Sequence, residues 1–213
     1  MNGGISMRKT ALLLVFCLIA TLFAGCAGTP VVYECTCPTE EVAEAPATPA
    51  APADGMAAFK AKVDKLTMMK EAGMKNVLVS NGTAELAILE EIIPYIDAMN
   101  IDLKGFTDRY YSDVLGGDRH QVMAFIEEAV KTCHIELTTL IVPGENDSED
   151  EIRSMSRWIS RMKNPDGSGV PLHITRFFPR FHMQDREATD VSRIYRLADI
   201  AREALEYVYT GNC

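Results

Sequence analysis

The chain has 213 residues, with 21 basic and 30 acidic side chains, a formal charge of −9 and 47% hydrophobic residues. This composition is that of an ordinary globular protein, which excludes collagen-like, fully disordered and disulfide-dense chains. The acidic balance also argues against nucleic acid as a partner, because the net field of the molecule repels phosphates.

The first residues have the pattern of an export signal. Arg8 and Lys9 precede an apolar run over residues 11–24, which is short for a membrane span. The run ends in LFAGC, and small residues directly before Cys26 are typical of the lipobox of bacterial lipoproteins. We therefore expect a lipoprotein-type signal peptide over residues 1–26 and a lipid on Cys26. An uncleaved anchor helix and a plain signal peptide are the alternatives.

This signal predicts a membrane-anchored lipoprotein of the bacterial cell envelope. The alternative is a cytoplasmic protein whose N-terminal segment is an artefact of gene fusion. Residues 27–55 are predicted to be a linker, because the Ala/Pro-rich stretch PTEEVAEAPATPAAPAD cannot bury enough surface to fold. Residues 56–213 then form one domain by length.

Helix and strand patterns alternate along this domain. Apolar residues at three- and four-residue intervals predict a first helix over residues 56–72, with Gly73 as its C-cap. Further helices are expected over residues 84–93, 117–132, 148–162 and 188–204, and strands over residues 75–80, 98–103, 135–142, 172–178 and 207–209. Asp147 or Ser148 caps the fourth helix, and Glu151 completes a capping box with Ser148. The alternation predicts an α/β fold, a parallel sheet with helices outside it.

Three of the predicted strands alternate between apolar and polar residues. Buried parallel strands usually read as unbroken apolar runs, because helices cover both faces. The polar positions are Asn100, Asp102, Lys104, Glu136, Thr138, His173 and Thr175. One polar face indicates a wet cavity like the inside of a partial or full βα-barrel, where ligands bind at the carboxyl ends of the strands.

Those ends carry Asn81, Lys104, Pro143–Gly144 and Arg176. Simpler interpretations exist for the candidate residues. Asn81 can belong to a strand-to-helix turn, and Asp102 and Lys104 can pair with each other or with Glu136. His173 can be a hydrogen-bonded histidine of the core.

Five stretches carry a family resemblance. They are NVLVSNG, PYIDAMNIDLKGF, ELTTLIVPGENDSEDEI, HITRFFP and YVYTGN, in order over residues 75–212. Together they resemble the C-terminal half of a radical SAM enzyme of the pyruvate formate-lyase activating-enzyme type, most closely the radical SAM protein of the AmmeMemoRadiSam system. The resemblance implies a partial (β/α) barrel and reductive cleavage of S-adenosylmethionine at a [4Fe–4S] cluster.

The resemblance also implies cofactor-binding residues. Asn81 resembles a polar residue that approaches S-adenosylmethionine, and Asp102 and Lys104 match an Asp-x-Lys near its methionyl part. A lysine and a carboxylate can complement the methionyl carboxylate and amine. His173 matches a histidine that reaches toward the nucleoside, and Thr138 stands where activating enzymes can carry an arginine. Catalytic residues are not assigned.

The cluster motif of the family is absent. Three thiolates in Cys-x-x-x-Cys-x-x-Cys hold the cluster in radical SAM enzymes, and this chain has no such spacing. Cys35 and Cys37 are weak candidates one residue apart, with Cys133 as a conceivable third ligand. A redox pair, a surface pair or spectator cysteines are the alternatives. No metal site is predicted.

Two functions follow from the sequence. The first is an incomplete radical SAM protein that needs a partner for the missing half of the barrel. The second is a non-catalytic, lipid-anchored binding or interaction domain derived from such a barrel. A half barrel exposes an edge at the strand over residues 75–80, so a homodimer is also expected.

Overall fold

The computed structural model describes residues 55–213. The predicted signal peptide with Cys26, the linker up to residue 54, and Cys35 and Cys37 lie outside the described residues. No helix within residues 55–213 is long and apolar enough to cross a membrane. The chain divides into two compact units between Lys65 and Leu66. Of the first unit, the structure describes only the beginning of helix α2 (Gly55–Glu71).

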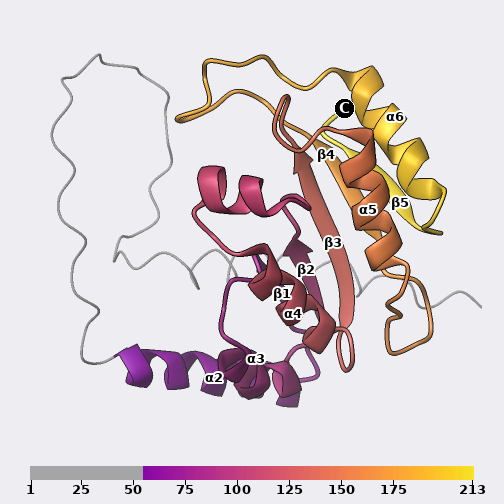
Figure 1. Ribbon diagram of the computed structural model, residues 1–213. Coiled ribbons are helices and arrows are strands. Elements are labelled where there is room, and N and C mark those ends of the chain that lie inside the picture. The colour runs from indigo at the N-terminus through magenta and orange to yellow at the C-terminus, as the bar shows by residue number, and fades with distance from the viewer. Residues whose placement is uncertain (1–54) are drawn as a thin grey trace, which may run out of the picture. The chain divides into compact units, whose positions relative to one another are not determined.

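The second unit is built on a five-stranded parallel sheet in the order β1-β2-β3-β4-β5 (Figure 1). The strands are β1 (Val77–Ser80), β2 (Ala98–Asp102), β3 (His134–Ile141), β4 (Leu172–Arg176) and β5 (Val208–Gly211). Because every crossover leads to the adjacent strand in the same direction, the crossover helices fall on one face of the sheet. This sequential order is that of a βα-barrel segment, since a doubly wound sheet reverses its order.

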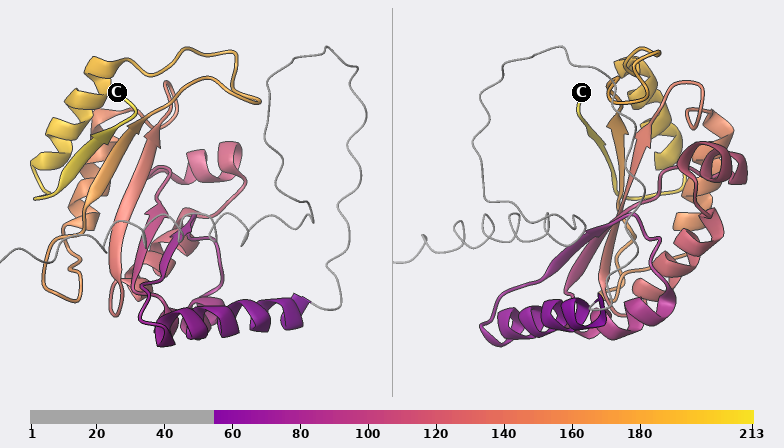
Figure 2. Two further views of the ribbon diagram at one scale, coloured as in Figure 1. Left: turned by 180° about the vertical axis from the view of Figure 1, so that it is seen from behind. Right: turned by 90° about the vertical axis from the view of Figure 1, so that its left-hand side faces the viewer.

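The helices of this unit are α3 (Leu86–Ile92), η1 (Ile93–Tyr95), η2 (Tyr110–Leu115), α4 (Arg119–Ala129), α5 (Glu149–Ile159) and α6 (Val191–Arg202). Figure 2 shows α4, α5 and α6 on the same side of the sheet. Ser148 is confirmed as the cap of α5, because its hydroxyl accepts a hydrogen bond from the Glu151 amide. The predicted capping box is not completed, because the Glu151 carboxylate accepts from the Phe106 amide instead of the Ser148 amide. The short helices η1 and η2, the latter a π-helix, were not predicted.

The core lies between the sheet and these helices. Most of the alternate strand residues that face the helices are apolar and buried, with the polar Ser80 and Thr139 as exceptions. Each buried apolar side chain contributes roughly 1.5–3 kcal/mol by leaving water. The fully buried residues of the strands include Ile101, Ile135, Leu137, Leu172 and Ile174, which pack with Phe125, Met155 and Leu197 of the helices. The predicted apolar face is therefore confirmed.

The other strand residues are half-exposed or exposed, which confirms the predicted polar face. The register aligns these residues in rows across the sheet. Asp102 lies beside Thr138, Thr138 beside His173, and His173 beside Tyr209. Three of the five predicted cofactor-binding residues therefore share one row.

Strand β1 is an edge, because within residues 55–213 it pairs only with β2. We expect this edge to drive self-association of the chain. Changing the exposed Val79 to lysine should reduce the associated mass, because a charge on an edge strand opposes pairing with another chain. Light scattering after size exclusion measures the mass.

Ser154→Lys is the control for this experiment. It adds the same charge to an exposed position on α5 and should leave the mass unchanged. A monomeric wild-type chain, or equal masses for Val79→Lys and wild type, would contradict the expectation.

Candidate functional site

A small pocket lies past the carboxyl ends of β1 and β2, with a volume of about 90 Å³. Its lining residues are Asn81, Thr83, Lys104, Tyr111, Leu115 and Gly117. Pockets for whole drug-sized ligands hold roughly 300–1,000 Å³. The pocket is therefore too small for a whole drug-sized ligand, which would extend beyond it.

Asn81 follows β1 and begins the turn into α3. Its Oδ1 atom accepts hydrogen bonds from the Thr83 amide at 3.2 Å and from the Thr83 hydroxyl at 2.8 Å. Gly82 between them has φ +70°, and a Cβ there would lie 3.1 Å from both Ile101 and Val122. The turn interpretation is therefore confirmed, and Asn81 also lines the pocket.

Asp102 and Lys104 form an ion pair with an Nζ–Oδ2 distance of 2.9 Å. Both side chains are half-exposed, at 37% for Asp102 and 39% for Lys104. Such a pair contributes about 0–1 kcal/mol to stability, because water screens the attraction. The pair can therefore be opened by a ligand at low cost.

Glu136 contacts two histidines and is not the partner of Lys104. Its Oε2 atom lies 2.7 Å from Nε2 of His173, and its Oε1 atom lies 3.4 Å from Nε2 of His134. The His173 ring also stacks on Tyr209 with 5.2 Å between centroids. His173 is thus hydrogen-bonded on the half-exposed face and is not part of the apolar core.

Thr138 is paired with a neighbour that the sequence did not single out. Its hydroxyl donates to Oδ1 of Asn100 at 2.8 Å. Asn100, Glu136 and Tyr209 belong to the polar face; Asn100 and Tyr209 were missed as contacts of the candidate residues, and Glu136 was considered only for Asp102 and Lys104. The period-two pattern marked the first two as polar, whereas their partners depend on the register between strands.

Tyr111 was also missed, because it lies on the unpredicted helix η2. The residue is buried, and its hydroxyl accepts a hydrogen bond from the Lys104 amide at 3.1 Å. Burial raises the pKa of Tyr111 to about 12, so the phenol stays protonated and keeps a proton to donate.

The described residues do not fit a [4Fe–4S] cluster. Cys133 is buried directly before β3, at the amino ends of the strands and away from the pocket. Burial raises the pKa of its thiol to about 12, whereas a cluster needs thiolates. Cys213 is exposed, and within residues 55–213 no three His, Cys, Asp or Glu side chains are arranged to hold a metal. Cys133 is therefore a poor third ligand for Cys35 and Cys37.

A sequential parallel sheet with one polar face defines a partial βα-barrel with a site at its carboxyl end. The family profile of the radical SAM superfamily matches residues 39–156, more than half of the chain. The chain belongs to the radical SAM superfamily. Members of this superfamily generally use S-adenosylmethionine and a [4Fe–4S] cluster.

One curated relative matches a large part of the chain. An uncharacterized protein of Methanocaldococcus jannaschii, MJ0808, is 32% identical over 158 residues, which cover 70% of this chain and 44% of the relative. The chain thus spans less than half the length of this curated relative.

Two solved structures share the fold. A domain of pyruvate-formate lyase-activating enzyme from Bacteroides vulgatus has a TM-score of 0.61 at 11% identity, covering 76% of this chain and 96% of that one. A radical SAM methyltransferase from Sphaerobacter thermophilus has a TM-score of 0.58 at 12% identity, covering 73% of this chain and 47% of that one. At these identities the likeness shows the fold alone.

Proposed function

We propose that this chain binds the methionyl group of S-adenosylmethionine in the pocket past β1 and β2, and that it lacks the cluster needed to cleave this cofactor. The observation that carries the proposal is the Asp102–Lys104 pair. It offers one anion and one cation, 2.9 Å apart, and Lys104 lines the pocket. Membership in the radical SAM superfamily supports the choice of ligand.

The chemistry of the two partners is complementary. A methionyl group carries one carboxylate and one ammonium group. The Lys104 ammonium can donate to the carboxylate, and the Asp102 carboxylate can accept from the ammonium. The ligand would replace one weak, half-exposed pair by two charge-assisted contacts. In this proposal the nucleoside extends from the pocket over the row that ends in His173 and Tyr209.

The cluster supplies the electron that cleaves S-adenosylmethionine in radical SAM enzymes, and this chain has no three-cysteine motif for it. Activity of the activating-enzyme type would then require a partner that provides the cluster half of the barrel. The second candidate function is a non-catalytic binding domain, and the missing motif is the observation that favours it.

Anaerobic reconstitution with iron and sulfide tests the cluster directly. We expect the chain from residue 27 onward to retain no stoichiometric cluster, because Cys35 and Cys37 do not have the family spacing. Iron and labile sulfide are counted per chain, and the absorption spectrum is compared before and after S-adenosylmethionine is added. The double variant Cys35→Ser, Cys37→Ser should retain the same background amounts of iron and sulfide as the wild type.

The opposite result would be about four irons per chain, a spectral change with S-adenosylmethionine, and loss of both in the double variant. The chain would then assemble its own cluster, and the enzyme would be complete without a partner.

A further inference from the structure

The backbone directly after β2 is held by three side chains from other parts of the second unit. The Tyr111 hydroxyl accepts from the Lys104 amide at 3.1 Å, and the Asn146 side-chain amide donates to the Lys104 carbonyl at 2.6 Å. Glu151 accepts from the Phe106 amide at 2.6 Å through Oε1. Tyr111, Asn146 and Glu151, named here the clamp, therefore bond the backbone on both sides of the Lys104 side chain.

The clamp residues are themselves fixed. Tyr111 is 3% exposed, Asn146 0% and Glu151 7%. Asn146 also accepts from the Val142 amide at 2.7 Å and donates to the Leu140 carbonyl at 2.8 Å. One side chain thereby joins the end of β3 to the end of β2.

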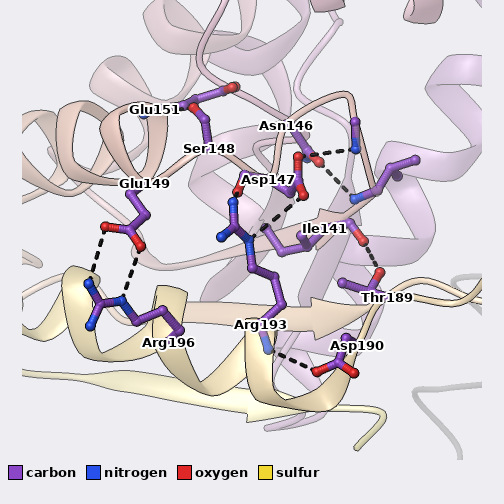
Figure 3. A network of polar contacts seen from close by, with 12 residues as sticks. Ile141, Asn146, Asp147, Ser148, Glu149, Glu151, Thr189, Asp190, Arg193 and Arg196 are labelled. Carbon is purple, nitrogen blue, oxygen red and sulfur yellow. Dashed lines mark hydrogen bonds and ion pairs between the residues drawn. The ribbon is translucent and has the colours of Figure 1, made fainter.

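The loop that carries Asn146 is anchored in turn on α6, as Figure 3 shows. Arg193 donates to the Asp147 carbonyl and lies 3.7 Å from the Asp147 carboxylate. Arg196 pairs with Glu149, the first residue of α5, at 3.1 Å. The clamp is therefore supported by α5 and α6, which pack on the sheet face opposite the polar face.

The held backbone passes very close to its supports. A Cβ on Gly105 would lie 2.6 Å from the Tyr110 ring and 3.1 Å from Oε1 of Glu151. A glycine allows this approach, because a Cβ would clash with the Tyr110 ring and crowd Glu151, so the backbone would have to shift. The sequence Lys-Gly-Phe is thus matched to the clamp.

We infer that the clamp positions Lys104 for the methionyl carboxylate. Asn146 and Glu151 do not line the pocket, so they act on the ligand only through the backbone that they hold. A fixed backbone removes freedom that binding would otherwise have to remove, and it sets the direction in which the lysine leaves the sheet. This inference rests on the proposed function.

Three variants of the full chain test the inference. Glu151→Ala removes the acceptor of the Phe106 amide, Glu151→Gln keeps a carbonyl there, and Asp150→Ala removes an exposed carboxylate one residue earlier. Titration calorimetry with S-adenosylmethionine gives the affinity, and hydrogen exchange reports the Phe106 amide. Circular dichroism confirms that each variant is folded.

We expect Glu151→Ala to bind S-adenosylmethionine about tenfold more weakly, because binding must then order the freed backbone, and fixing one residue costs roughly that factor. Its Phe106 amide should exchange faster than in the wild type. Glu151→Gln should restore both properties to within about twofold, and Asp150→Ala should match the wild type.

The outcomes separate the two claims. Wild-type affinity in a folded Glu151→Ala chain would overturn the positioning role and leave the proposed function standing. A wild-type chain that does not bind S-adenosylmethionine would overturn both. If Glu151→Ala does not fold, Tyr111→Phe removes only a hydroxyl, and it should speed exchange of the Lys104 amide and weaken binding. Unchanged affinity in that variant would equally overturn the inference.

Discussion

Changing Lys104 to methionine is expected to weaken binding of S-adenosylmethionine by at least about tenfold, because a hydrogen bond to a charged group contributes roughly 1.5–3 kcal/mol. Methionine keeps an unbranched apolar stem, so the pocket wall is retained while the ammonium is lost. Asp102 also loses its partner, and the free carboxylate then repels the methionyl carboxylate. Titration calorimetry at fixed ionic strength measures the change.

Lys75→Met is the matched control. Lys75 forms an ion pair with Asp97 at 2.9 Å, the same distance as in the Lys104 pair, but it precedes β1 and so lies at the amino ends of the strands, opposite the pocket. Lys75→Met removes the same charge and also breaks a surface ion pair. A difference in affinity between the two variants therefore measures the contribution of Lys104 to the site. Equal affinities for Lys104→Met and Lys75→Met would exclude the proposed methionyl site.

Changing Asn146 to alanine is expected to lower the free energy of unfolding by about 3–5 kcal/mol. Its side chain satisfies two carbonyls and one amide, on Lys104, Leu140 and Val142, and the residue is fully buried. Each buried backbone group left without a partner costs about 1–3 kcal/mol, and local relaxation recovers part of the sum. Urea unfolding followed by circular dichroism measures the difference.

Asn81→Ala serves as the comparison, because Asn81 makes its hydrogen bonds in an exposed turn. We expect a change near 0.5 kcal/mol there. A loss below about 1 kcal/mol for Asn146→Ala would show that water or a shifted loop replaces its bonds.

Much of the fold follows from local sequence patterns. Period-two alternation in the strands and three- to four-residue spacing in the helices depend only on neighbours in the chain. The positions of the five strands along the chain were therefore predictable. The ends of the strands were less predictable, because a strand ends where its neighbouring strand no longer provides a pairing partner. The predicted strand over residues 172–178 ends at Arg176, because its partner β3 ends at Ile141, which pairs with Arg176.

The candidate site was predicted in part. The polar positions and the pair Asp102 and Lys104 were visible as residue types in a pattern, and the structure places Asn81 and Lys104 in one pocket. The sequence did not show which of these polar side chains form hydrogen bonds or ion pairs with one another. Glu136 was an equal candidate partner for Lys104 until the register placed it between two histidines.

The sequence by itself determined the alternation of elements, the polar face and the absence of a three-cysteine motif, because all of these are properties of residue type and spacing. Only the tertiary structure decided how the end of β2 is held. Asn146 and Glu151 meet the backbone there from 42 and 45 residues away. No local pattern encodes such contacts, since they exist only after β3 and α5 have packed beside β2.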